Sequence, residues 1–173
     1  MTVDRSFIRV KAMLVAPNED LTAHAVSLNP PTAENPGGYH RLIGGSVEVG
    51  ESHRDAIVRE VNEELGATVH DLRWLATVEN IFRLNGTLGH EIVFLYSGRL
   101  DPLPAPQDAT LTEIDGSVVP VVWRSFREDD EPLPLYPSAA LAWVRHLAER
   151  TARPERRARS AGGAPQRDRQ ILD

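Results

Sequence analysis

The chain has 173 residues, of which 41% are hydrophobic and 25% charged, a composition that fits one globular domain with a core of ordinary size. The absence of cysteine excludes disulfide frameworks, thiolate zinc sites, iron–sulfur clusters and cysteine nucleophiles, and no stretch reaches the roughly 18 apolar residues that a membrane helix needs. The net charge of −6 is unevenly distributed: residues 1–150 have 13 basic and 22 acidic side chains, and residues 151–173 have six basic and three acidic ones. Sequence-independent nucleic-acid binding needs clustered Lys and Arg, so the acidic residues 1–150 are poorly suited to it.

Six strands are expected from segments rich in β-branched and apolar residues, at 7–16, 21–28, 39–43, 72–82, 91–100 and 118–123. The first two are expected to form a hairpin, because the turn-forming sequence Pro-Asn-Glu-Asp separates them. Helices are expected at 52–65 and 138–150, where apolar residues recur at helical spacing. Mixed strands with two helices indicate an α+β layered domain over residues 1–150, and the Arg-rich residues 151–173 are predicted to be a disordered tail.

The mid-chain helix carries a cluster of carboxylates. Glu60 precedes Glu63 by three residues and Glu64 by four, so the three side chains share one helix face. Like charges at these spacings destabilise an isolated helix. A solvated helix face is one interpretation. A hard divalent cation such as Mg²⁺ or Mn²⁺ is the other, because such ions prefer carboxylate oxygens.

Residues at fixed offsets from this cluster favour the metal site. Gly44 and Gly45 precede the helix and allow a main-chain carbonyl to approach a metal or a phosphate closely. Glu51, at the helix entrance, lies within reach of Arg59, and an ion pair between them would fix the preceding loop to the helix. Gly66 is a normal helix stop.

The segment from residue 45 to 67, GSVEVGESHRDAIVREVNEELGA, resembles the Nudix box, G-x5-E-x7-R-E-U-x-E-E-x-G-U, in which U is a bulky aliphatic residue. The fixed positions of the box are matched by Gly45, Glu51, Arg59, Glu60, Glu63, Glu64 and Gly66. Val61 fills the first aliphatic position, and Ala67 is smaller than usual at the last. Ile43 stands where many family members have proline, so substrate assignments do not transfer from those members.

The resemblance implies a Nudix α/β/α sandwich with a mixed β-sheet, and a Mg²⁺-dependent hydrolase (Mn²⁺ being the other candidate ion). The family hydrolyses diphosphates linked to a second group, usually nucleotides. By the family pattern Glu60, Glu63, Glu64 and the carbonyl of Gly45 would bind metal. One helical carboxylate could also act as general base, and Glu60 or Glu64 is the candidate. Arg59 and Glu51 would orient these groups.

Several candidate residues lie outside the box. Some family members place another acid on a late loop, and Glu113 is either that base or ligand or an ordinary exposed glutamate. Glu91 is expected to be solvated at a sheet edge, and a role facing the cleft is the alternative. A nucleotide needs a stacking surface and a cation for its second phosphate. The candidates for substrate binding are Tyr39, Arg41, Phe82 and Arg83.

The expected function is hydrolysis of a small-molecule nucleotide substrate, either ADP-ribose-like or a nucleoside triphosphate. The alternative is a nucleotide-binding Nudix module without significant hydrolase activity, which normally lacks box glutamates that are all present here. RNA decapping is disfavoured by the acidic domain. We expect a cytoplasmic protein with no membrane partner and no stable nucleic-acid partner, and a homodimer by resemblance alone.

Overall fold

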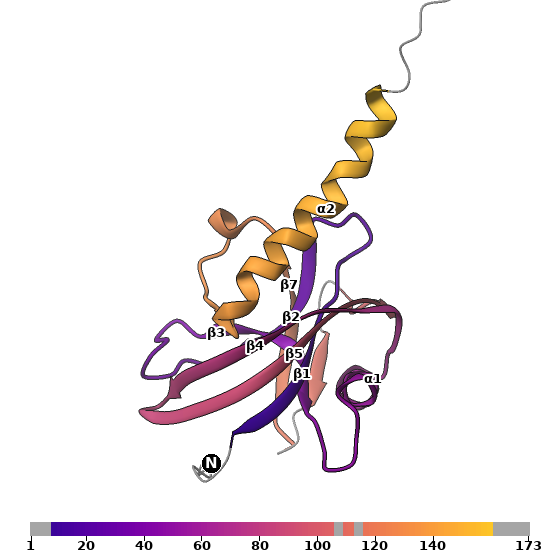
Figure 1. Ribbon diagram of the computed structural model, residues 1–173. Coiled ribbons are helices and arrows are strands. Elements are labelled where there is room, and N and C mark those ends of the chain that lie inside the picture. Colours follow the sequence, from indigo (N-terminus) through magenta and orange to yellow (C-terminus); the bar gives the residue numbers. More distant parts are fainter. Residues whose placement is uncertain (1–7, 106–108, 113–115, 161–173) are drawn as a thin grey trace, which may run out of the picture.

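The computed structural model describes residues 8–105, 109–112 and 116–160 (Figure 1). In this part of the chain eight strands form one sheet, accompanied by two α-helices and two short 3-10 helices. The elements in chain order are β1 (Arg9–Val15), β2 (Ala23–Asn29), β3 (Tyr39–Ser46), α1 (His53–Leu65), β4 (Thr68–Leu84), β5 (Thr87–Asp101), β6 (Thr110–Thr112), β7 (Val118–Ser125), η1 (Glu128–Asp130), β8 (Leu135–Tyr136), η2 (Ser138–Ala140) and α2 (Leu141–Ser160).

The strands follow the order β4-β5-β1-β3-β2-β7-β6, and β8 pairs with β3. β1 is parallel to β5 and antiparallel to β3, so the sheet is mixed, as predicted. The predicted hairpin between the first two strands is wrong, because β3 lies between β1 and β2. Instead β2 pairs with β3 and β7, and a single bridge joins His24 to Pro17 after β1.

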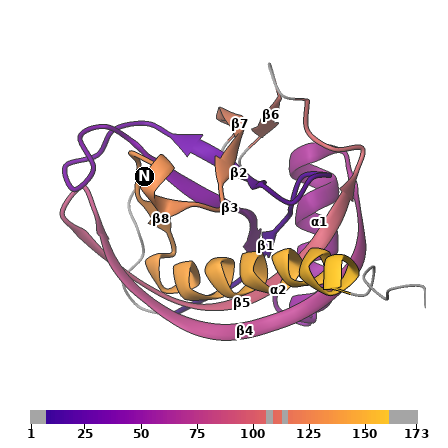
Figure 2. The ribbon, with the colours of Figure 1, turned by 90° about the horizontal axis from the view of Figure 1, so that it is seen from above.

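Successive residues of β1 point to opposite faces of the sheet and divide the core in two. On one face Ala12 and Leu14 pack with Ile57 of α1. On the other face Met13 packs with Val144 of α2. Each helix therefore covers one face of the sheet, which is the predicted α/β/α arrangement. Figure 2 shows β4 and β5 curving around α2.

The end of the chain differs from the prediction. α2 continues to Ser160, so the backbone of residues 151–160, predicted to be disordered, is helical. Four of these ten residues are arginine and two are alanine, both strong helix formers, which the interpretation from charge did not take into account. The rest of the predicted tail, 161–173, lies outside the described residues. No helix in the described part of the chain is long and apolar enough to span a membrane.

The turn between β3 and α1 positions the candidate site. The N–H of Val47 donates to the carbonyl of Val10, and the N–H of Glu51 donates to the carbonyl of Glu48, at 2.9 and 3.1 Å. These hydrogen bonds hold the turn against the sheet just before α1 begins. The acidic face of α1 therefore lies over the last residues of β3.

Candidate active site

Both ends of α1 are capped, and Gly66 ends the helix as the sequence indicated. The Ser52 hydroxyl accepts a hydrogen bond from the Asp55 N–H at 3.1 Å and donates to the Asp55 carboxylate at 2.7 Å. Gly66 has φ +61°, and its N–H donates to the Asn62 carbonyl at 2.9 Å. A left-handed residue at this position favours glycine, which has no Cβ to clash. The helix and its carboxylates are thus fixed in register by local sequence.

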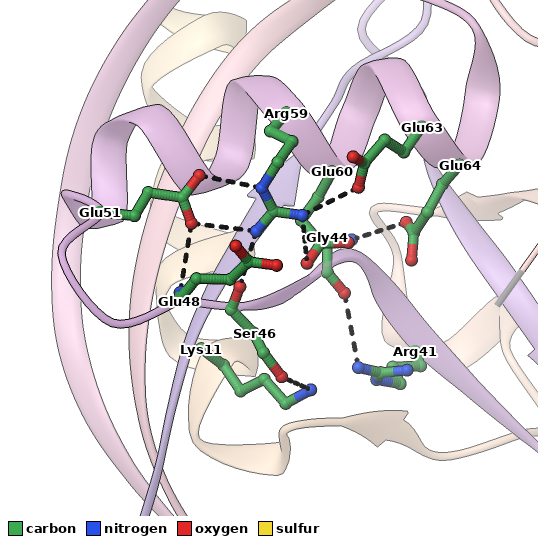
Figure 3. A network of polar contacts seen from close by, with 10 residues as sticks. All are labelled: Lys11, Arg41, Gly44, Ser46, Glu48, Glu51, Arg59, Glu60, Glu63 and Glu64. Atoms are coloured by element: carbon green, nitrogen blue, oxygen red, sulfur yellow. Dashed lines mark hydrogen bonds and ion pairs between the residues drawn. The ribbon is translucent and has the colours of Figure 1, made fainter. Parts of the chain in front are cut away.

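Arg59 is the centre of the polar network in Figure 3. Its Nε and Nη2 donate to the two carboxylate oxygens of Glu51 at 2.9 and 3.0 Å, which confirms the predicted ion pair. Nη2 also donates to the Ser46 carbonyl at 3.0 Å, and Nη1 donates to Glu63 Oε2 at 2.8 Å. The hydrogen bonds from Arg59 lower the pKa of Glu51 and, in return, raise the pKa of Arg59. One guanidinium therefore ties the turn, the end of β3 and the helix together.

Glu60 is buried against the main chain of Gly45. The residue is 2% exposed, and a Cβ at position 45 would lie 2.3 Å from the Glu60 carboxyl carbon. Glu60 Oε1 is 3.2 Å from Arg59 Nη1, but it accepts no hydrogen bond from any described residue. Because a buried carboxylate is costly unless its oxygens are paired, this oxygen has capacity for a cation.

The other two box carboxylates are held by different partners. Glu63 is exposed and accepts from Arg59, whereas Glu64 Oε2 accepts from the Gly44 N–H at 3.2 Å. Arg41 Nη2 lies on the other side of Gly44 and donates to its carbonyl at 3.4 Å. As they stand, no three acidic or histidine side chains of the described residues are grouped closely enough to hold a metal. The donors are nevertheless all hard oxygen atoms, as Mg²⁺ and Mn²⁺ prefer.

A buried lysine beside the box was missed by the sequence interpretation. Lys11 Nζ donates to Ser46 Oγ at 2.9 Å, and the carbonyl of the same Ser46 accepts the hydrogen bond from Arg59 Nη2. Burial, followed by the positive charge of Arg41, lowers the pKa of Lys11 to about 8. The available signal was a second cationic residue, after Arg9, in a β1 segment that is otherwise apolar.

The prediction that Glu91 is solvated at a sheet edge is wrong. Glu91 is buried on β5, which lies between β4 and β1 and is therefore an interior strand. Its carboxylate pairs with Arg9 Nη2 at 2.8 Å and accepts from Asn80 Nδ2 at 3.0 Å. The Arg9 guanidinium also lies 5.9 Å from the centre of the Phe82 ring.

The four candidate substrate-binding residues lie in different surroundings. Arg41 reaches Gly44 at the box, and Tyr39 makes an edge contact with Tyr136 at 5.3 Å between ring centres. Phe82 lies over Gly89, where a Cβ would be 2.4 Å from the ring. Arg83 donates to the Gly86 carbonyl in the β4–β5 turn at 3.1 Å. The remaining candidate, Glu113, lies outside the described residues.

Comparison with known proteins agrees with this geometry. Residues 13–144, more than half of the chain, match the NUDIX domain family. The chain belongs to the Nudix family. The Nudix fold of this chain is also similar to the MutT NUDIX hydrolase from Burkholderia pseudomallei, with 22% identity, a TM-score of 0.57, and coverage of 83% of this chain and 98% of that one.

Two further Nudix structures show the same fold. The MutT structure from a study of Aliivibrio salmonicida and Vibrio cholerae has 19% identity and a TM-score of 0.54, and covers 83% of this chain and 99% of its own. The MutT protein from Methanosarcina mazei has 21% identity and a TM-score of 0.53, covering 88% and 98%. The chain is a Nudix hydrolase that acts on pyrophosphate bonds, and hydrolases of this family generally use divalent metals and small nucleotide substrates.

Proposed function

We propose that this Nudix hydrolase cleaves the diphosphate of a nucleoside diphosphate linked to another group, with Mg²⁺ or Mn²⁺ as cofactor. The two substrate classes are an ADP-ribose-like linked nucleoside diphosphate and a nucleoside triphosphate. The observation that carries the proposal is the buried Glu60 carboxylate, which packs on Gly45 and has an oxygen that accepts no hydrogen bond from the described residues. A carboxylate in this position fits a hard cation far better than it fits a solvated helix face.

Glu60, Glu63, Glu64 and the Gly45 carbonyl would hold the metal. When bound, a divalent ion lowers the pKa of a coordinated water and neutralises the bridging phosphate oxygens. Glu60 or Glu64 would accept the proton from the attacking water. Arg59 and Glu51 hold the turn and the helix at a fixed separation, so these carboxylates need little reorganisation.

Two cationic side chains lie beside the box. Arg41 donates to Gly44 directly next to the box, and Lys11 is hydrogen-bonded to Ser46. We assign Arg41 and Lys11 to the phosphates of the substrate. Tyr39 and Phe82 are the aromatic candidates for the base, and Arg83 is a further cation at the β4–β5 turn.

An assay over a panel of ADP-ribose, other linked nucleoside diphosphates and nucleoside triphosphates tests the proposal, with Mg²⁺, with Mn²⁺ and with EDTA. We expect metal-dependent turnover of one class. Release of a nucleoside monophosphate with a sugar phosphate identifies the linked class, and release of pyrophosphate identifies the triphosphate class. If the panel binds without turnover, the nucleotide-binding module replaces the enzyme.

The metal site is tested by Glu63→Gln combined with Glu64→Gln. We expect at least roughly a hundredfold loss of kcat/KM, because two of the proposed metal ligands lose their charge. The matched control combines Glu79→Gln with Glu149→Gln, two exposed glutamates outside the box, and should retain activity. Near-normal activity of the Glu63/Glu64 variant would show that the metal assignment is wrong.

A further inference from the structure

A cavity lies away from the box. Its volume is about 570 Å³, and it is lined by the β1–β2 turn, the beginning of β4, the end of β5 and α2. Figure 1 shows α2 passing the turn after β1. The β1 strand runs from the box toward this cavity. Lys11 pairs with Ser46 at the box end, and Pro17, six residues after Lys11, lines the cavity. At about 3.3 Å per residue, the cavity is roughly 20 Å from Ser46 along the strand.

The lining of this cavity combines an apolar floor with a basic rim. Half-buried leucines form the floor: Leu75, Leu103 and Leu147. The rim carries three exposed arginines and a histidine: Arg73, Arg99, Arg150 and His146. The indole of Trp74 also lines the cavity and is 59% exposed. A large exposed aromatic ring beside a concave surface is typical of a ligand site.

An irregularity in β4 brings these side chains together. In a regular strand successive residues point to opposite faces, so Arg73, Trp74 and Leu75 would not line one cavity. The pairing of β4 with β5 is shifted twice, between His70 and Arg73 and again between Trp74 and Ala76. Such bulges re-aim side chains and are frequent next to binding sites.

Folding does not account for the positive charge of the rim. Arg99 approaches Asp71 at 3.9 Å, but both side chains are exposed, and exposed pairs of this kind contribute little to stability. The side chains of Arg73 and Arg150 have no ion pair with any described residue. Glu19 and Asp71 are the acidic residues of the lining, against three arginines, in a domain that is otherwise strongly acidic.

We propose that this cavity binds a nucleoside monophosphate or a ligand of the same chemistry, with a phosphate at one end and an aromatic ring at the other. The arginines of the rim donate hydrogen bonds to the phosphate, for which a planar guanidinium is well matched. The Trp74 indole stacks on the base. The cavity volume lies within the range of small-ligand sites, and binding here does not depend on hydrolysis at the box.

The test is calorimetric titration of the full chain with AMP in EDTA, so that no metal-dependent turnover occurs. Three proteins are compared: the natural chain, a variant with Arg73→Gln and Arg99→Gln, and a Trp74→Leu variant. We expect AMP to bind the natural chain saturably, and its Kd to rise at least about tenfold in each variant, which corresponds to about 1.4 kcal/mol. Arg145→Gln, an exposed arginine of α2 outside the cavity, is the matched control and should leave the Kd unchanged.

Two further measurements locate the site. The Glu63→Gln, Glu64→Gln double variant should retain AMP binding, because the box lies elsewhere. Adenosine and inorganic phosphate, each lacking half of the ligand, should bind at least about tenfold more weakly than AMP. The proposal is overturned if AMP does not bind, if the cavity variants bind it like the natural chain, if only the box variant loses it, or if phosphate alone binds equally well. Circular dichroism and thermal unfolding check that each exposed-residue variant is folded.

Discussion

Glu60 and Gly45 meet at a distance that leaves no room for a side chain at position 45. A Cβ atom on residue 45 would lie 2.3 Å from the carboxyl carbon of Glu60, so the carboxylate already occupies that space. The same contact packs the carboxylate against the main chain of Gly45, whose carbonyl is the proposed main-chain ligand. The box glycine is therefore explained here by close approach rather than by a turn.

Replacing Gly45 by alanine should displace Glu60. We expect Gly45→Ala to weaken Mg²⁺ binding and lower kcat, and to destabilise the fold by about 1–3 kcal/mol, as overpacking does. Gly37→Ala is the matched control, because a Cβ there meets only Leu133 at 3.5 Å, an ordinary contact. Metal titration, steady-state kinetics and denaturant unfolding measure the three effects. Equal metal affinity and kcat in the two variants would contradict the proposed role of Gly45.

Residue spacing predicted the ion pair that links the turn before α1 to the helix. Glu51 lies just before the helix and Arg59 two turns into it, so their ion pair could be expected from the spacing alone. The burial of Lys11 and Glu91 could not be predicted in the same way. Their surroundings depend on which strands flank β1 and β5, and that order follows from long-range pairing that local patterns do not encode.

At the scale of elements, the site depends on how the turn after β3 is attached to α1. Arg59 makes this attachment with two parallel hydrogen bonds to Glu51 and a third to the Ser46 carbonyl. A planar guanidinium can make all three at once, whereas an ammonium group cannot reproduce the fork. A lysine at this position would keep the positive charge but would lose the three hydrogen bonds to Glu51 and Ser46.

The Arg59→Lys change should therefore weaken metal binding while leaving the fold intact. Removal of a group that orients metal ligands typically costs about 10- to 100-fold in affinity or activity, and we expect a loss in that range. Arg54→Lys, an exposed arginine of the same helix, serves as the control and should behave like the natural chain. Mg²⁺ titration and kcat/KM provide the readouts. An Arg59→Lys protein as active as the Arg54→Lys protein would show that charge alone is sufficient.

The predicted elements were correct where the local signal was strong. The 52–65 helix prediction is confirmed because cap residues and apolar spacing agree at both ends. The short strands β6 and β8 were missed, since three- and two-residue strands carry no usable periodicity. The hairpin prediction failed because a turn-forming sequence indicates a reversal of the chain but not the neighbour of the next strand.

Over the whole molecule, β2, β3 and β7 enclose a buried group of basic side chains. Arg124 is 1% exposed, and its Nη1 donates to the Leu133 carbonyl at 2.6 Å and to His40 Nδ1 at 2.8 Å. Since arginine is only a donor, His40 Nδ1 is the acceptor and must be unprotonated. His24 is fully buried and stacks on Phe126, and neither of its ring nitrogens has a hydrogen-bond partner among the described residues.

Both histidines should therefore make the fold sensitive to acid. Burial, followed by the charge of Arg124, lowers the pKa of His24 to about 3 and that of His40 to about 4. In the unfolded chain a histidine titrates near 6.5, so below that pH the unfolded state binds more protons than the folded state. The free energy of unfolding is then fully retained above about pH 6.5 and falls as the pH drops toward 4. Each histidine contributes a slope of roughly 1.4 kcal/mol per pH unit.

Denaturant unfolding between pH 7.5 and 4.5 measures this slope, and His24→Phe should reduce it by about half. Phenylalanine preserves the ring contact with Phe126, removes the site of proton uptake and leaves no buried nitrogen to desolvate, so stability at neutral pH should be maintained. His70→Gln changes a histidine whose side chain is 43% exposed and is the control, whose slope should match that of the natural chain. Equal slopes for His24→Phe and the natural chain would mean that His24 is not the buried neutral group that couples stability to pH. In that case other titrating groups would have to account for the acid sensitivity, with the carboxylates of the box the first to be tested by adding Mg²⁺ at each pH.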